Sequence, residues 1–135
     1  VEVAASTSMH AKTILVIEDE GAVRRLVTDI LSQAGYVVLE ASGGQEALAL
    51  SREFVGEIDL VVSDVVMPTM NGPQVAEELA RVRPGIRVMF MSGYTEDSVI
   101  PRGPLDARAP FILKPFTPDE FAEKVREALA ETARG

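Results

Sequence analysis

Cysteine is absent from this chain of 135 residues, and histidine occurs once, as His10. Without cysteine the chain forms neither a disulfide scaffold nor a thiolate metal site. Because His10 lies in a short polar start, we expect neither a histidine-rich zinc site nor a catalytic triad that uses a core histidine. No apolar run approaches the roughly 18 residues of a membrane span. No positively charged segment opens the chain, so we also expect no signal peptide.

Positive charge is scarce as well. The chain has 13 lysines and arginines against 21 aspartates and glutamates, which gives a formal net charge of −8. Direct nucleic-acid binding requires a basic surface, so we do not expect it here. Hydrophobic residues make up 47% and charged residues 25% of the chain, a balance that is typical of a globular domain and excludes a disordered one. We therefore expect a soluble domain in the reducing cytoplasm.

The length fits one domain, because domains commonly contain about 150 residues. Residues 1–11 are small, polar and aperiodic, and we interpret them as a linker or an added tail. The domain itself is expected to span residues 12–133. The linker-like start favours a domain taken from a longer protein over a stand-alone one.

Short apolar runs alternate with stretches of helical periodicity along the chain. The runs predict five strands, at Thr13–Ile17, Tyr36–Ala41, Asp59–Ser63, Arg87–Met91 and Phe111–Leu113. Apolar residues at helical spacing predict five helices, at about residues 23–34, 42–52, 71–83, 97–100 and 117–129. The fourth helix is expected to be short or distorted, because prolines follow it closely. The strict alternation predicts an α/β fold with a doubly wound parallel sheet and helices on both faces.

Three of the predicted helices begin with capping signals. Ser42 with Gln45, and Thr117 with Glu120, have the spacing of a capping box, in which side chains and backbone N–H groups bond reciprocally. The pair Asn71-Gly72 offers an N-cap for the third helix. These patterns predict where the second, third and fifth helices start.

Polar residues directly follow four of the five predicted strands. They are Glu18, Asp19 and Glu20 after the first strand, Asp64 after the third, Ser92 after the fourth and Lys114 after the fifth. Ligands of open parallel sheets bind beyond the carboxyl ends of the strands. We therefore expect these side chains to converge on one rim of the sheet.

The residue types on this rim favour phosphoryl chemistry on a carboxylate. Two carboxylates about 4 Å apart repel each other by roughly 4 kcal/mol at an effective dielectric of 20, so a cluster of Glu18, Asp19 and Asp64 requires a cation. Hard oxygen ligands with positions left for water favour Mg²⁺. A metal and Lys114 would neutralise a transferred phosphoryl group, a carboxylate would act as the nucleophile, and the Ser92 hydroxyl would bond a phosphoryl oxygen.

The residues of this rim lie in four segments, which read in order ILVIEDE, VVSDVVMP, MSGYTED and ILKPF. Together these segments resemble the response-regulator receiver domain of two-component signalling, over about residues 12–132. The SGYTED and LKPF segments are most similar to receivers fused to hybrid sensor histidine kinases. The resemblance implies a flavodoxin-like sheet of five parallel strands in the order 2-1-3-4-5.

The resemblance also implies roles for the acidic residues. Asp64 matches the phosphoacceptor, Asp19 matches the acidic ligand of Mg²⁺, and Glu18 matches the neighbouring acid that acts through water. The backbone carbonyl of Val66 matches the remaining protein ligand. Glu18 stands where many members carry Asp, a common variation that lengthens the path to the metal.

Further matches concern the switch that follows phosphorylation. Ser92 matches the hydroxyl that moves toward the phosphoryl group, and Lys114 matches the phosphate-binding lysine, whose bond to Pro115 is typically cis. Phe111 matches the switch aromatic that rotates inward, although a plain core role for this ring stays open. Gly72 matches the glycine that lets the loop turn after the acceptor strand.

These roles imply a phosphorylation switch. A histidine kinase or a histidine phosphotransfer domain would donate a phosphoryl group to Asp64 with Mg²⁺, and the new charge would bias a two-state equilibrium. The domain would not be an enzyme in the usual sense, although it would catalyse its own phosphorylation and dephosphorylation. A hybrid parent protein would supply the kinase.

Two other functions are kept as alternatives. A phosphorylation-independent docking module would carry the same acidic pocket as a vestige. A phosphatase or phosphotransferase that acts on small substrates often carries a second acid two residues after its nucleophile, and Val66 holds that place here.

The arginine pairs Arg24–Arg25 and Arg81–Arg83 are interpreted as solvated helix faces.

Overall fold

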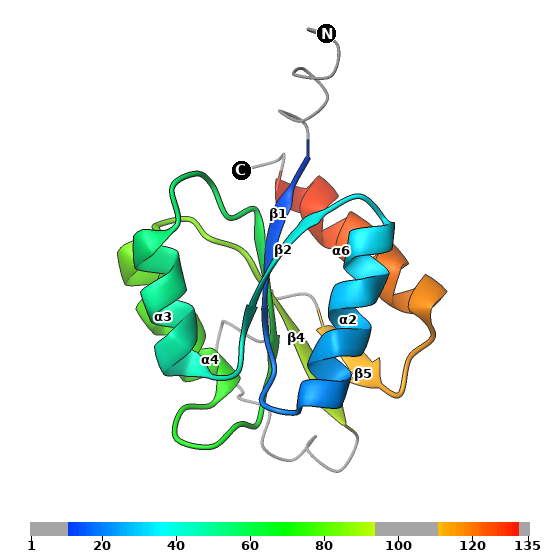
Figure 1. Ribbon diagram of the computed structural model, residues 1–135, viewed down its shortest axis with the longest axis horizontal. Helices are drawn as coiled ribbons and strands as arrows, with labels where there is room; N and C mark the ends of the chain where they lie inside the picture. Colours follow the sequence, from blue (N-terminus) through cyan, green and yellow to red (C-terminus); the bar gives the residue numbers. More distant parts are fainter. Residues whose placement is uncertain (1–10, 94–110, 133–135) are drawn as a thin grey trace, which may run out of the picture.

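The computed structural model describes residues 11–93 and 111–132, which contain five strands and four helices (Figure 1). The strands are β1 (Thr13–Ile17), β2 (Val37–Ala41), β3 (Leu60–Asp64), β4 (Val88–Gly93) and β5 (Phe111–Lys114). The helices are α2 (Gly21–Gln33), α3 (Gly44–Glu53), α4 (Gly72–Val82) and α6 (Pro118–Thr132). All five predicted strands are confirmed, whereas the predicted helix at residues 97–100 lies outside the described residues.

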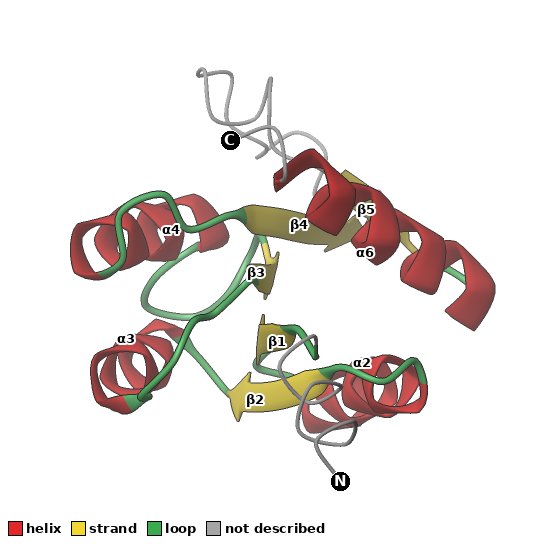
Figure 2. Ribbon diagram, turned by 90° about the horizontal axis from the view of Figure 1, so that it is seen from above, coloured by secondary structure: helices red, strands yellow, loops and turns green. Residues whose placement is uncertain are grey.

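The strands form one sheet in the order β2-β1-β3-β4-β5, and every neighbouring pair is parallel. This is the order that the resemblance implied. Figure 2 shows α2 and α6 on one face of the sheet and α3 and α4 on the other. The carboxyl ends of the strands consequently meet at one edge, where Asp64 of β3 pairs in register with Met91 of β4.

Two apolar clusters fill the spaces between the sheet and its two helix layers. Ile14 and Val16 of β1 belong to the cluster under α2 and α6, and Leu15 and Ile17 belong to the cluster under α3 and α4. Successive side chains of a strand point to opposite faces, so a strand covered on both sides must be apolar throughout. This explains the uninterrupted apolar run of β1, in which every residue is buried. No helix among the described residues is long and apolar enough to cross a membrane.

Two of the predicted helix starts are confirmed by their caps. Asn71 caps α4 in a reciprocal box with Gln74, in which each side chain accepts from the other residue's backbone N–H at 2.9 Å. Thr117 and Glu120 form the same arrangement at the start of α6, with donor–acceptor distances of 2.9 and 3.0 Å. Both boxes satisfy N–H groups that the first turn of a helix leaves without partners.

The capping box predicted for α3 is wrong. The N-cap is Gly43 rather than Ser42, and a glycine has no side chain that could cap the helix. The backbone N–H and the hydroxyl of Ser42 both donate to Oε1 of Glu46 at 2.8 Å instead. The helix begins one residue later than expected, so its third residue is Glu46 and not Gln45. In a capping box the side chain of the third helical residue bonds back to the residues before the helix, and Glu46 does so here with Ser42.

The sequence predicts that Arg83 lies on a solvated helix face, and this prediction is wrong. From the C-cap of α4 its guanidinium donates to the backbone carbonyl oxygens of Ser51, Phe54 and Gly56, at 3.0, 2.7 and 2.7 Å respectively. These carbonyls belong to the end of α3 and the loop that follows it. Arg83 therefore fastens α3 to α4 on one face of the sheet.

We expect Arg83→Met to lower the free energy of unfolding by about 2 kcal/mol, because three carbonyl groups lose a charged donor. Arg81→Met is the matched control, since Arg81 is exposed on the same helix, and it is expected to change stability by less than about 0.5 kcal/mol. Urea unfolding followed by far-UV circular dichroism measures both. Equal unfolding midpoints for the two variants would contradict the role given to Arg83.

Candidate functional site

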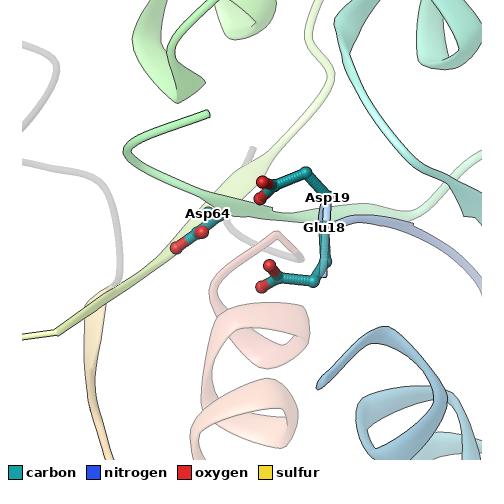
Figure 3. Close-up of side chains that lie close together, drawn as sticks. All are labelled: Glu18, Asp19 and Asp64. Carbon is teal, nitrogen blue, oxygen red and sulfur yellow. The ribbon is translucent and has the colours of Figure 1, made fainter. Parts of the chain in front are cut away.

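Three carboxylates meet at the carboxyl edge of the sheet. Glu18 and Asp19 follow β1, and Asp64 ends β3 (Figure 3). One oxygen from each of the three lies within 4.8 Å of the others. Glu18 and Asp64 are buried, at 1% and 4% exposure, whereas Asp19 is exposed. The predicted convergence of these acids is thus confirmed, and one of them faces solvent.

Lys114 places its ammonium group between the two buried acids. Its Nζ lies 3.1 Å from Oδ1 of Asp64 and 3.4 Å from Oε1 of Glu18. Partial burial of the ammonium lowers its pKa, but the neighbouring carboxylates outweigh this effect and raise the pKa of Lys114 above its ordinary value. Lys114 consequently stays protonated near neutral pH. The peptide bond that joins it to Pro115 is cis, as the resemblance implied.

The charged form of Glu18 is destabilised by its surroundings. Burial and the nearby charge of Asp64 raise the pKa of Glu18 to about 7, although the N–H of Glu20 and the ammonium of Lys114 stabilise its charged form. Its Oε2 accepts from the N–H of Glu20 at 3.1 Å. In the described part of the chain, the ammonium of Lys114 is the one that contacts this cluster of three carboxylates, so the site has an excess of negative charge.

This excess and the donor set fit a divalent cation. The oxygens of Glu18, Asp19 and Asp64 are hard ligands, and the exposure of Asp19 leaves room for water, which suits Mg²⁺. Val66 lies two residues beyond Asp64, and its side chain is exposed. The resemblance implies that its backbone carbonyl binds the metal, and this role stays a prediction.

Gly72, the first residue of α4, supports the backbone of the central acid. Its N–H donates to the carbonyl oxygen of Val65 at 2.7 Å. A Cβ atom at this position would lie 2.4 Å from the carbonyl oxygen of Asp64 and 3.1 Å from the ring of Phe90. The glycine is therefore required by close approach of two backbone segments, which differs from the turn-forming reason that the resemblance gave.

Ser92 and Phe111 occupy different ends of neighbouring strands. Ser92 is fully buried in β4 and pairs in register with Leu113, one residue before Lys114. It thus lies near the carboxyl edge, as predicted. Phe111 begins β5, three residues before Lys114 and so about 10 Å from it along the strand. Its half-buried ring packs against the small cluster of Val65, Ala76 and Phe90.

Arg24 is a site residue that the sequence did not reveal. Its Nη1 donates to the carbonyl oxygen of Glu18 at 2.7 Å, and its Nε lies 3.4 Å from Oε1 of Glu40. The expectation of a solvated side chain is wrong for Arg24, although Arg25 beside it is exposed. Hydrophobic periodicity gave no signal for Arg24, because the partners of its side chain lie outside its own helix.

Comparison with known proteins adds three findings. A family model described as the response regulator receiver domain matches residues 14–126. The chain is 46% identical over 117 residues to the sensor kinase CckA of Brucella abortus, an alignment that covers 87% of this chain and 12% of the kinase. It is 29% identical over 117 residues to the chemotaxis protein CheY of Thermotoga maritima, which covers 86% of this chain and 96% of that protein.

Solved structures of receiver domains also match this chain. The receiver domain of the hybrid histidine kinase CckA matches with a TM-score of 0.72 and 36% identity, over 87% of this chain and 98% of that one. A CheY-like receiver domain protein from Methanospirillum hungatei matches with a TM-score of 0.77 and 31% identity, over 92% of this chain and 98% of that one. The chain therefore spans a small part of one relative and nearly the whole of others.

We expect Glu18→Gln to stabilise the protein when no divalent cation is present, because it removes a buried charge that Asp64 repels. At about pH 8 in EDTA the melting temperature should rise by about 5 °C, which corresponds to roughly 1–2 kcal/mol. Added Mg²⁺ should raise the melting temperature of Glu18→Gln by less than it raises the melting temperature of the wild type. Glu53→Gln, an exposed acid at the end of α3, is the control. An unchanged melting temperature with an undiminished response to Mg²⁺ would contradict this account.

We expect Gly72→Ala to cost about 2 kcal/mol of stability, because the added methyl group overlaps the carbonyl of Asp64. Gly21→Ala is the matched control, since Gly21 also begins a helix and a Cβ there would meet only Arg24, at 3.8 Å. That control should be neutral or slightly stabilising. Urea unfolding of both variants checks the prediction, which fails if the two lose the same stability.

Proposed function

The chain belongs to the response-regulator receiver domain family of two-component signalling, and on that premise we propose that Asp64 accepts a phosphoryl group from a phosphohistidine. The contact that carries the proposal is the ion pair between Nζ of Lys114 and Oδ1 of Asp64, at 3.1 Å. It sits inside the cluster of three carboxylates at the edge where ligands of such sheets bind.

The proposed transfer is a single displacement at phosphorus. One oxygen of the Asp64 carboxylate attacks, a P–O bond forms, and the P–N bond of the donor histidine breaks. The imidazole leaves with the electron pair of that bond, and it leaves neutral when its other nitrogen carries a proton. Lys114 offers its positive charge to the phosphoryl oxygens, where charge accumulates during the transfer.

The metal in this proposal is Mg²⁺. Asp19, Asp64 and the carbonyl of Val66 would hold the ion, and Glu18 would act on it through water. When bound, it neutralises charge on the phosphoryl oxygens and on the clustered carboxylates. The chain's own residues would contribute in two ways. Lys114 stays protonated and keeps its positive charge, and the burial of Asp64 would shield the phosphorylated carboxylate from bulk water.

Signalling would follow from the charge that phosphorylation adds, about −1.5 to −2. In this proposal the Ser92 hydroxyl and Lys114 move toward the new group, and the movement reaches Phe111. Phe111 packs against a cluster that contains Val65, the residue after Asp64, and this packing supports such a relay. Residues 12–133 would form the switching domain, with residues 1–11 as a linker.

The proposed partner is a histidine kinase or a histidine phosphotransfer domain, and the proposed location is the cytoplasm. The likeness to a short part of the sensor kinase CckA supports a parent protein of the hybrid kinase class. The domain's own chemistry would be limited to gaining and losing the phosphoryl group at Asp64.

We expect incubation with Mg²⁺ and acetyl phosphate to add about 80 Da, one phosphoryl group, to the intact protein. The increase should be absent in EDTA and in Asp64→Asn, because the metal or the nucleophile is then missing. Asp29→Asn, an exposed acid on α2, should be phosphorylated like the wild type. Intact-mass spectrometry measures all four samples.

No mass increase at any donor concentration, together with no spectral change on adding beryllofluoride, would overturn the phosphoacceptor function. The protein would then be a docking module that keeps an acidic pocket without using it.

A further inference from the structure

Arg24 reaches from the first turn of α2 back to the turn that carries the acidic pair. Its Nη1 donates to the carbonyl oxygen of Glu18 at 2.7 Å, and its Nε faces Oε1 of Glu40, which belongs to the edge strand β2, at 3.4 Å. The backbone N–H of Arg24 also donates to the carbonyl oxygen of Glu20 at 2.9 Å. One side chain thus joins the β1–α2 turn, the helix and the neighbouring strand.

Among the residues that the structure describes, the turn is held by bonds to Glu18, and not by bonds to Asp19. The N–H of Glu18 donates to the carbonyl of Ala41 at 3.1 Å, its carboxylate accepts from the N–H of Glu20, and its carbonyl accepts from Arg24. The exposed Asp19 carboxylate makes no hydrogen bond or ion pair to any described residue. Its position therefore depends on the backbone of the turn.

We propose that Arg24 is a positioning residue for the cation site, which holds the Glu18–Asp19 turn in the conformation that presents the Asp19 carboxylate to Mg²⁺. This inference rests on the Mg²⁺ site of the proposed function. Residues that hold metal ligands in place commonly change metal affinity by tenfold or more when they are replaced. Arg24 would do so through a backbone carbonyl and not through a ligand side chain.

The sign of the effect separates positioning from simple charge. A guanidinium near a cation site repels the cation, so removal of its charge alone would strengthen Mg²⁺ binding. Removal of a positioning contact weakens binding. Arg25 offers a matched control, because it carries the same charge on the next residue, is exposed and makes no hydrogen bond or ion pair to the described part of the chain.

The test compares Mg²⁺ dissociation constants of the wild type, Arg24→Met and Arg25→Met. Isothermal calorimetry or amide chemical shifts provide them, because the chain has no tryptophan whose fluorescence would report binding. We expect Arg24→Met to bind about tenfold more weakly and Arg25→Met to bind as the wild type does or slightly more tightly. Arg24→Lys keeps one charged donor and should recover part of the lost affinity.

A second measurement needs no metal. In EDTA, the amide hydrogens of the Glu18–Glu20 turn should exchange several-fold faster in Arg24→Met than in the wild type or in Arg25→Met. If Arg24→Met does not fold, Arg24→Gln and Arg25→Gln replace the pair.

The outcomes distinguish the two proposals. Wild-type binding of Mg²⁺ with equal or tighter binding by Arg24→Met would overturn the positioning role and leave the metal site intact. Absence of Mg²⁺ binding by the wild type would overturn both. Weaker binding with unchanged amide exchange in the turn would also count against positioning, since the turn would then be held without Arg24.

Discussion

The compensation of negative charge at one edge of the sheet is the constraint on which the functional site depends. Parallel strands bring Glu18, Asp19 and Asp64 together, and two of these acids are buried. Lys114 supplies the only ammonium that contacts them among the described residues, and it contacts both buried acids. The remaining negative charge favours a cation, and in the proposed function that cation would let the same site accept a phosphoryl group.

The backbone around the acids is built to keep this arrangement rigid. Gly72 brings the start of α4 against the carbonyl of Asp64, at a distance that no side chain would permit. On the other side of the site, Arg24 ties the carbonyl of Glu18 to the edge strand. Glu18 and Asp64 are thus each supported from a helix that starts nearby. A precise site requires such support, because small displacements weaken electrostatic stabilisation of a reacting group.

A contiguous apolar contact links the site to the far end of β5. Val65 follows Asp64 directly and packs with Ala76, Phe90 and Phe111. Phe90 also lies against Gly72, so the same ring touches the segment that supports Asp64 and the cluster that holds Phe111. In the proposed switch, this packing would carry a displacement at Asp64 toward the surface at β5.

Much of the fold and the polar edge was predictable from local patterns. Apolar runs and helical spacing identify elements because burial on one or both faces imposes a period of residue types, and Asp64 and Lys114 follow from their places after strands. Features that depend on contacts between distant segments were not predictable. The N-cap of α3 at Gly43 was missed by one residue, and Arg24 and Arg83 were taken for solvated side chains.

By itself, the sequence determined the α/β alternation, the buried strands and the set of acids, the hydroxyl and the lysine at the strand ends. Only the tertiary structure decided what Arg24, Gly72 and Arg83 do. Each of them acts on backbone atoms of another segment, and a backbone carbonyl has the same chemistry at every residue. No residue type marks such a partner, so only the folded chain reveals which carbonyl each of the three meets.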